Sequence, residues 1–185
     1  MPIRRIPVRP YFLSILFCLL SFLCSLPVHA LTRTQWVDSV YHTLTLAQRI
    51  GQLYMIAAYS GTDKFNQPLI EKLISEQGIG GLIFMQGTPE AQAQQLNHYQ
   101  QLSRVPLWVG MDAEWGLAMR MDDITAFPHE LTLGAIQQDS LIEEMGYRLG
   151  MQCRNLGIQV NFAPVVDVNS DPLNPVINDR SFGEL

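Results

Sequence analysis

Residues 107–116 read LWVGMDAEWG, a short apolar run that ends in two carboxylates. The apolar part, residues 107–111, has no polar–apolar alternation, which is typical of a parallel strand buried on both faces. Ligands of parallel α/β folds bind at the carboxyl ends of the strands. Asp112 and Glu114 follow the predicted strand directly, and Trp115 stands beside them. The stretch therefore predicts a strand and, at its end, a site for a polar ligand with an apolar face, such as a sugar ring.

The rest of the chain alternates short apolar runs with helical stretches. Pro89 behind Thr88 predicts a helix that begins with a Thr88 N-cap and runs to about Ser103. Another helix is expected to begin with a cap at Asp139 or Ser140. Further strands are predicted at residues 50–57, 82–85 and 158–166, and a further helix at residues 68–76. Strands that alternate with helices predict an α/β fold with a parallel sheet.

Two α/β architectures fit this pattern. A TIM (β/α)8 barrel takes about 250 residues and eight strands, so about four β/α units would make its N-terminal half. A doubly wound fold of four or five strands fits a chain of 185 residues equally well. Periodicity alone does not separate the two.

Composition narrows the class of ligand. The hydrophobic content of 48% is typical of a globular domain. The formal net charge is −5, which argues against nucleic acid or an anionic membrane as partner and is compatible with a neutral carbohydrate. Paired Cys and His spacings typical of zinc sites are absent from the sequence, so neither a metal nor a cofactor is expected.

The N-terminus has the organisation of a secretory signal. Three arginines among the first nine residues precede an apolar run at residues 11–26, and residues 28–30 read VHA. This order predicts a signal peptide, residues 1–30, cleaved after Ala30, and export of the domain at residues 31–185 to the periplasm or the cell exterior. A membrane anchor is the alternative, but the apolar run is shorter than the about 20 residues of a spanning helix. We expect no stable membrane insertion after cleavage.

Cleavage at this point would also decide the cysteine chemistry. Cys18 and Cys24 would leave with the signal peptide, and Cys153 would remain in a helical pattern. A mature chain with one cysteine has no intramolecular disulfide, so Cys153 is predicted to be a small buried apolar residue.

Other polar residues could join the site after residue 111. Arg120 could donate paired hydrogen bonds into the same site, although a single arginine is more often a surface charge. Asp167 follows the last predicted strand, and its alternative role is to bond loop backbone. His129 is expected to be structural. Because a glycosidase usually needs two carboxyl groups, Asp112 and Asp167 would be the obvious pair in the absence of further information.

Three segments together resemble glycoside hydrolase family 3, in the order and at the spacing of that family. They are Asp112-x-Glu114 with Arg120, residues 161–168 (NFAPVVDV) and residues 174–183 (NPVINDRSFG), and the resemblance covers residues 44–185. The resemblance implies a (β/α)8 barrel, of which this chain would be the N-terminal half. It also implies retaining hydrolysis through a covalent glycosyl-aspartate.

Within the family, the motifs fit the β-N-acetylhexosaminidase branch better than the β-glucosidase branch, which usually has Asp-Ala-Val-His-Gly at the first motif. The resemblance therefore implies a glycan substrate with terminal β-linked N-acetylglucosamine. It makes Asp112, Arg120 and Arg180 sugar-binding residues rather than catalysts, with Glu114, Asp167 and Asp179 in possible support of the site.

The sequence departs from the family pattern in two places. Trp115 replaces the first glycine of the turn after Asp112, which is expected to reshape the mouth of the pocket. Asn178 stands where glycine is usual. Asparagine tolerates a positive φ better than most residues, so we expect the loop to keep its conformation.

The family's Lys-His-Phe-Pro-Gly-His-Gly motif, its acid/base Asp-His pair and its nucleophilic aspartate have no counterpart in these 185 residues. We therefore expect no catalytic residue within this chain and no activity of the chain by itself. A β-glucosidase of the same family and a non-catalytic sugar-binding remnant are the alternatives.

Overall fold

The computed structural model describes residues 30–61, 66–171 and 173–184. The predicted signal peptide lies outside the described residues except for Ala30. The chain divides into two compact units, Met1–Ser39 and Val40–Leu185, and all the described strands belong to the second. No helix in the described ranges has both the length and the apolar character needed to cross a membrane.

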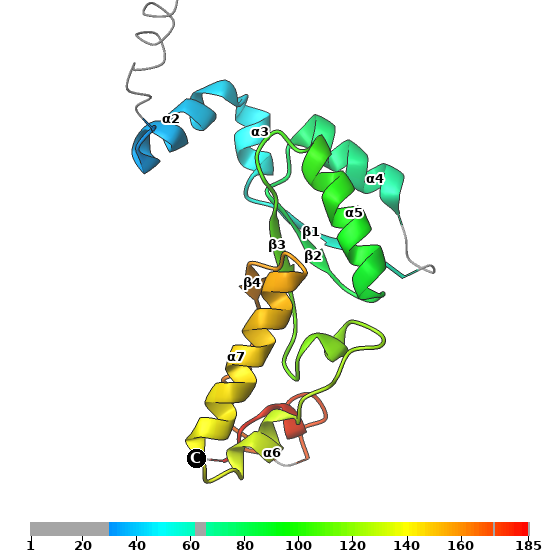
Figure 1. The fold of residues 1–185 in the computed structure, drawn as a ribbon, viewed down its shortest axis with the longest axis vertical. Helices are drawn as coiled ribbons and strands as arrows, with labels where there is room; N and C mark the ends of the chain where they lie inside the picture. Colours follow the sequence, from blue (N-terminus) through cyan, green and yellow to red (C-terminus); the bar gives the residue numbers. More distant parts are fainter. Residues whose placement is uncertain (1–29, 62–65, 172, 185) are drawn as a thin grey trace, which may run out of the picture. The chain divides into compact units, whose positions relative to one another are not determined.

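Strands alternate with helices along the chain (Figure 1). The α-helices are α2 (Arg33–Thr43), α3 (Leu46–Gly51), α4 (Gln67–Lys72), α5 (Pro89–Leu102), α6 (Glu130–Gly134) and α7 (Asp139–Asn155). The strands are β1 (Met55–Ala58), β2 (Gly81–Phe84), β3 (Trp108–Met111) and β4 (Val160–Asn161). A π-helical turn, η1 (Leu73–Gln77), extends α4, and two 3-10 turns are η2 (Leu117–Met119) and η3 (Asn178–Arg180).

The four strands form one parallel sheet in the order β1-β2-β3-β4. Gly81 is the partner of Met55 on one side and of Trp108 on the other, and Gly110 is the partner of Val160. A doubly wound sheet reverses its strand order at a switch point, and this sheet does not. The fold is therefore α/β with four parallel strands in barrel order, as the first half of a (β/α)8 barrel requires.

One face of the sheet carries the core. Leu82, Phe84, Val109 and Met111 have no exposed surface, and they occupy alternate positions, which point to the same side of a strand. The helices contribute Ile70, Ile74, Leu96, Tyr99 and Cys153 to the same cluster. The expectation that Cys153 is a buried apolar residue is confirmed.

The strand predicted at residues 50–57 begins later than expected, because a helix occupies its first part. Thr45 caps α3: its hydroxyl accepts from the backbone N–H of Gln48 at 3.2 Å, and the Gln48 side chain accepts from the Thr45 N–H at 3.0 Å. This reciprocal capping box starts a helix that runs to Gly51. Strand β1 then begins only at Met55.

Two further predictions near α7 are wrong. The strand expected at residues 158–166 is paired only at Val160–Asn161, and Pro164 has no N–H with which to extend the ladder. The N-cap of α7 is Gln138, not Asp139 or Ser140, and it makes no side-chain cap bond. The Ser140 hydroxyl instead accepts a hydrogen bond from the Gln138 side chain at 3.0 Å.

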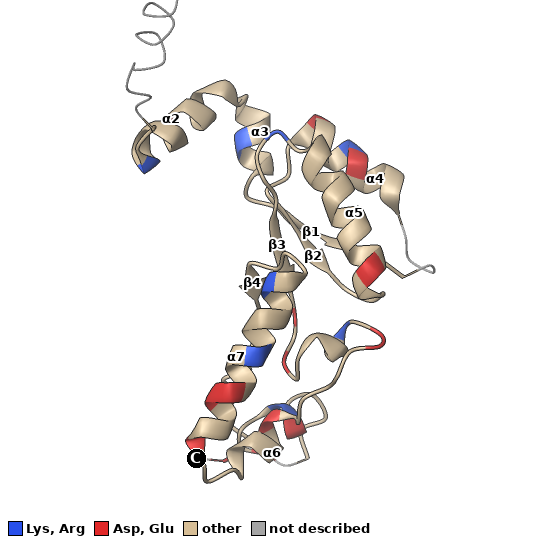
Figure 2. Cartoon of the chain, in the orientation of Figure 1, with Lys and Arg blue, Asp and Glu red and all other residues tan. Residues whose placement is uncertain are grey.

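The remaining central elements are confirmed to within a residue or two. Strands β2 and β3 lie where apolar runs predicted them, and α5 begins at Pro89. The Thr88 hydroxyl accepts from the Ala91 N–H at 3.2 Å, as its predicted capping role requires. Figure 2 shows β1, β2 and β3 without charged residues, whereas charged residues lie on the helices, directly after β3 and around α6. The charged residues after β3 lie beyond the carboxyl end of that strand.

Candidate functional site

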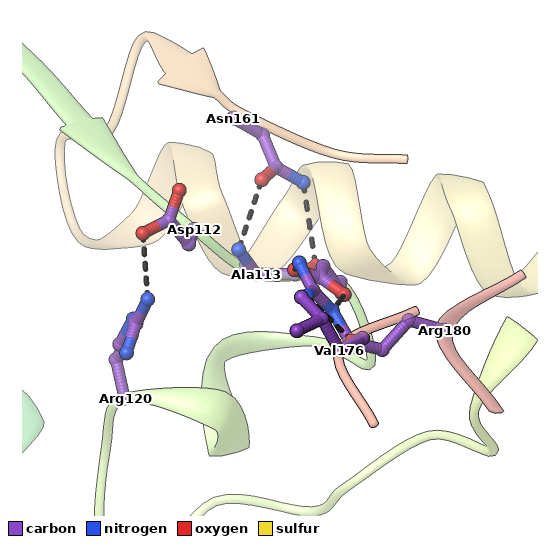
Figure 3. A network of polar contacts seen from close by, with 7 residues as sticks. Asp112, Ala113, Arg120, Asn161, Val176 and Arg180 are labelled. Atoms are coloured by element: carbon purple, nitrogen blue, oxygen red, sulfur yellow. Dashed lines mark hydrogen bonds and ion pairs between the residues drawn. The ribbon is translucent and has the colours of Figure 1, made fainter. Parts of the chain in front are cut away.

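Asp112 and Arg120 meet directly after β3. The Arg120 Nη2 donates to Asp112 Oδ2 at 2.6 Å, and both side chains are partly buried (Figure 3). The turn η2 brings Arg120 back toward the strand, and its first residue, Leu117, is fully buried. Arg120 Nε is buried without a hydrogen-bond partner among the described residues. The pair thus offers a half-satisfied carboxylate and unmatched N–H donors at the end of β3.

A second carboxylate–arginine pair joins Glu114 to the loop of residues 174–183. Arg180 Nε donates to Glu114 Oε2 and its Nη2 donates to Oε1, both at 2.8 Å. Arg180 Nη1 also donates to the Val176 carbonyl at 3.1 Å (Figure 3). The Glu114 side chain is only 5% exposed, and its hydrogen bond raises the pKa of Arg180. This two-pronged bond fixes both side chains, because the planar guanidinium matches both carboxylate oxygens at once.

Asn161 of β4 holds the backbone between the two carboxylates. Its Oδ1 accepts from the Ala113 N–H at 3.1 Å, and its Nδ2 donates to the Ala113 carbonyl at 3.5 Å (Figure 3). Asn161 belongs to the motif at residues 161–168, but the motif alone predicts no role for it. Its position beside the end of β3 in the sheet is the signal that could have identified it. Asn161 thereby orients Asp112 and Glu114, which flank Ala113.

His129 joins the same region through two contacts. Its ring stacks on the Trp115 ring, with centroids 4.1 Å apart and planes 15° apart. Its Nδ1 lies 2.8 Å from Asp179 Oδ2. Asp179 precedes Arg180 in η3, so His129 connects the turn after β3 to the loop that carries Arg180. The expectation of a structural histidine agrees with these contacts, but its partners could not be predicted from the sequence.

Glu130 is a buried carboxyl that the sequence did not single out. It is 1% exposed, and its Oε2 has no hydrogen-bond partner within the described part of the chain. Burial raises its pKa, and the charge of Glu114 raises it further, whereas His129 and Arg180 lower it. Glu130 is therefore a second carboxyl close to the Glu114–Arg180 pair. Its burial and the charge of Glu114 both favour its neutral form.

Asp167 does not pair with Asp112. Its side chain makes no hydrogen bond within the described residues; its main-chain carbonyl instead accepts from the Ser181 hydroxyl at 2.7 Å. The charge of its carboxylate adds to the effect of Glu114 in raising the pKa of Arg180. Asp167 lines a shallow pocket of about 170 Å³ with neighbouring valines and residues 181–183. The side-chain bond to loop backbone, one of the two roles that the sequence leaves open for Asp167, is therefore not formed within the described residues.

The loop before Arg180 passes through a left-handed backbone conformation at Asn178. Asn178 has a φ of 38°, in the left-handed region that glycine would adopt more readily. This is the positive φ that the sequence predicted asparagine would tolerate. Across the described ranges, no group of three or more His, Cys, Asp or Glu side chains is placed to hold a metal ion.

Residues 45–185 match the sequence profile of the family described as Glycosyl hydrolase family 3 N terminal domain. The chain is 35% identical over 167 residues to Beta-hexosaminidase A of Pseudoalteromonas piscicida, with 76% of this chain and 28% of the relative covered. It is 25% identical over 148 residues to Beta-N-acetylglucosaminidase/beta-glucosidase of Cellulomonas fimi, with 80% of this chain and 26% of the relative covered.

A solved structure agrees with these sequence relatives. The glycoside hydrolase family 3 beta-N-acetylglucosaminidase from Paenibacillus sp. str. FPU-7 superposes with a TM-score of 0.65 at 36% identity, covering 76% of this chain and 28% of that chain. The chain therefore spans just over a quarter of the length of these relatives.

Proposed function

This chain belongs to glycosyl hydrolase family 3 through its N-terminal domain, and on that premise we propose that the protein containing it removes terminal β-linked N-acetylglucosamine from glycans. The reaction proposed is hydrolysis with retention of configuration at the anomeric carbon. The likeness to a beta-hexosaminidase and to a solved beta-N-acetylglucosaminidase supports this substrate class.

The observation that carries the proposal is the pair of carboxylate–arginine contacts at the end of β3, Asp112 with Arg120 and Glu114 with Arg180. Asp112 uses Oδ2 for Arg120, which leaves Oδ1 to accept from a sugar hydroxyl. The terminal N–H groups of Arg120 and Arg180 that are not bonded to the carboxylates can donate to sugar oxygens. Alternating acceptors and donors of this kind suit the hydroxyls of a terminal sugar.

In this proposal Asp112, Arg120 and Arg180 bind the sugar. Glu114 is buried with both oxygens bonded to Arg180, so it orients the arginine and does not reach the substrate. Asp179 holds the neighbouring loop through His129, and Asp167 adds negative charge near Arg180.

The bond-breaking groups would lie elsewhere in the protein. Retaining hydrolysis needs a nucleophile and an acid/base group about 5–5.5 Å apart. Asp112 and Glu114 are each bonded to an arginine, which suits binding better than proton transfer. We propose that both catalytic groups come from sequence outside these 185 residues, since the chain spans 28% of the solved relative.

We also propose that the protein is exported through a signal peptide at residues 1–30. The basic, apolar and VHA segments support this location. N-terminal sequencing of the protein from its native host should find Leu31 first. A retained Met1 in the secreted fraction would contradict the cleavage.

The test of the activity uses the purified protein that contains this chain. We expect it to release p-nitrophenol from the N-acetyl-β-glucosaminide with a higher kcat/KM than from the β-glucoside, and the first product seen by NMR to be the β-anomer. The reverse preference would favour a β-glucosidase, a possibility kept open by the C. fimi relative. Binding of N-acetylglucosamine without turnover would favour a sugar-binding remnant.

A further inference from the structure

Two separate links connect the turn after β3 to the loop that carries Arg180. One runs from Glu114 to Arg180 through two hydrogen bonds of 2.8 Å. The other runs from the next residue, Trp115, through the stacked ring of His129 to Asp179, which precedes Arg180. The two links therefore run side by side in the sequence: Trp115 follows Glu114, and Asp179 precedes Arg180.

The link through Trp115, His129 and Asp179 is held in place by contacts that do not involve Glu114 or Arg180. The Phe127 N–H donates to the Trp115 carbonyl at 3.0 Å, which fixes the chain leading to His129. His129 is the N-cap residue of α6. At the other end of α6, Gly134 packs so closely on the loop that an added Cβ would lie 1.8 Å from the Phe182 carbonyl oxygen. Helix α6 is thus a base against which the loop of residues 178–183 is held.

We infer that His129 and Trp115 are positioning residues that set the orientation of Arg180 through Asp179. The inference rests on the proposed function, because it assumes that Arg180 binds the sugar. The three-residue 3-10 turn that begins at Asn178 has no side-chain cap hydrogen bond. The His129–Asp179 contact restrains this turn one residue before Arg180.

The geometry explains why such a restraint matters. A two-pronged guanidinium–carboxylate bond requires the plane of Arg180 to match that of Glu114, so a small rotation of the loop weakens both hydrogen bonds together. The N–H groups of Arg180 that face the sugar must also keep their positions, because a displaced donor makes a weaker hydrogen bond. Replacing His129 or Trp115 can therefore weaken substrate binding by Arg180 even if neither residue contacts the substrate.

The experiment compares His129→Ala, Arg180→Ala and the double variant in the complete protein, with the N-acetyl-β-glucosaminide as substrate. We expect His129→Ala to raise KM roughly tenfold with little change in kcat, because misplacing a binding group removes uniform binding. In the Arg180→Ala background, His129→Ala should raise KM no further. Trp115→Phe keeps an aromatic ring for the stack on His129, so its KM should stay close to that of the unmodified protein. Trp115→Ala removes the ring and should raise KM as His129→Ala does.

A matched control is available in the same chain. His98 Nε2 lies 2.7 Å from Glu71 Oε1, a similar histidine–carboxylate contact between α5 and α4. His98→Ala should leave KM and kcat unchanged. If His129→Ala lowers kcat at unchanged KM, or adds its full effect to Arg180→Ala, His129 is merely structural and the inference is wrong.

A second measurement does not depend on turnover. In hydrogen-exchange mass spectrometry, peptides covering residues 176–183 should exchange faster in His129→Ala than in the unmodified protein or in His98→Ala. Unchanged exchange there would overturn the positioning role even if the enzyme is active. Absence of hydrolysis, or Arg180→Ala with normal kinetics, would instead contradict the proposed function, while faster loop exchange would still support the coupling.

Discussion

Arg180 is bonded by a buried carboxylate and by a backbone carbonyl, so its side chain has one well-defined orientation. We expect Arg180→Ala to lower kcat/KM for the N-acetyl-β-glucosaminide. A hydrogen bond involving a charged group is worth roughly 1.5–3 kcal/mol, which is on the order of a tenfold to hundredfold loss. Arg148→Ala is the control, because Arg148 forms an exposed pair with Glu144 on α7. Steady-state kinetics that are unchanged in a folded Arg180→Ala variant would remove Arg180 from the site.

Glu130 predicts a pH dependence of stability whose sign follows from its burial. Its pKa is raised in the folded protein by burial, so its contribution to stability is full below the unfolded pKa of about 4.3 and is lost as pH rises through the folded value. Glu130→Gln cannot ionise and keeps the shape of the side chain. The variant should therefore gain in melting temperature relative to the unmodified protein as pH rises from about 4 to 8. An equal difference at both pH values would show that Glu130 does not titrate in this way.

Some of the site could be predicted from residues alone and some could not. Asp112 and Arg120 are eight positions apart, and a turn after a strand brings such residues together; the structure places them 2.6 Å apart. Glu114 and Arg180 are separated by 66 positions, so only the family resemblance places both in one site, and the bond between them is known from the structure alone. The roles of His129 and Glu130 depend on where a loop without periodicity folds back, and hydrophobic patterning carries no information about that.

At the scale of elements, helix α6 and the loop it supports give a paired prediction. Gly134→Ala would place a Cβ 1.8 Å from the Phe182 carbonyl oxygen, so the loop must shift. We expect a loss of about 1–3 kcal/mol in stability, with a higher KM because the loop carries Arg180. Gly146→Ala in α7 meets nothing within 4 Å and should stabilise the protein by about 0.5–1 kcal/mol. Chemical denaturation of both variants checks the pair, and equal effects would contradict the close packing of α6.

Helices and strands are predicted at the right residues where the sequence has a strong local pattern, such as an apolar run or a helix cap. Apolar runs located β2 and β3, and Thr88 with Pro89 located the start of α5. The strand predicted at residues 50–57 is wrong in its first part because residues 50 and 51 complete α3, which begins at the Thr45 capping box. Strand β4 is shorter than its apolar run, since apolar character marks burial and not hydrogen bonding to a neighbouring strand.

At the scale of the whole molecule, the described sheet is a barrel wall with two edges. β1 and β4 each pair on one side only, within the described residues. Large apolar side chains near the strands are exposed, including Leu53 (84%), Trp108 (59%) and Val166 (87%). In a closed barrel, side chains of all eight strands fill the interior and no edge is free. The apolar surface here is consistent with a wall that needs the rest of the barrel to be covered.

This incompleteness predicts the behaviour of residues 31–185 expressed alone. We expect the segment to aggregate, because open strand edges and exposed apolar faces promote association between chains. We also expect no hydrolysis, since Asp112 and Glu114 are each bonded to an arginine, which suits binding better than proton transfer. Size-exclusion chromatography and thermal melting test the first expectation, and p-nitrophenol release tests the second. A monomer that melts cooperatively and releases p-nitrophenol from the N-acetyl-β-glucosaminide would contradict both expectations, and it would return Asp112 and Asp167 to consideration as the catalytic pair.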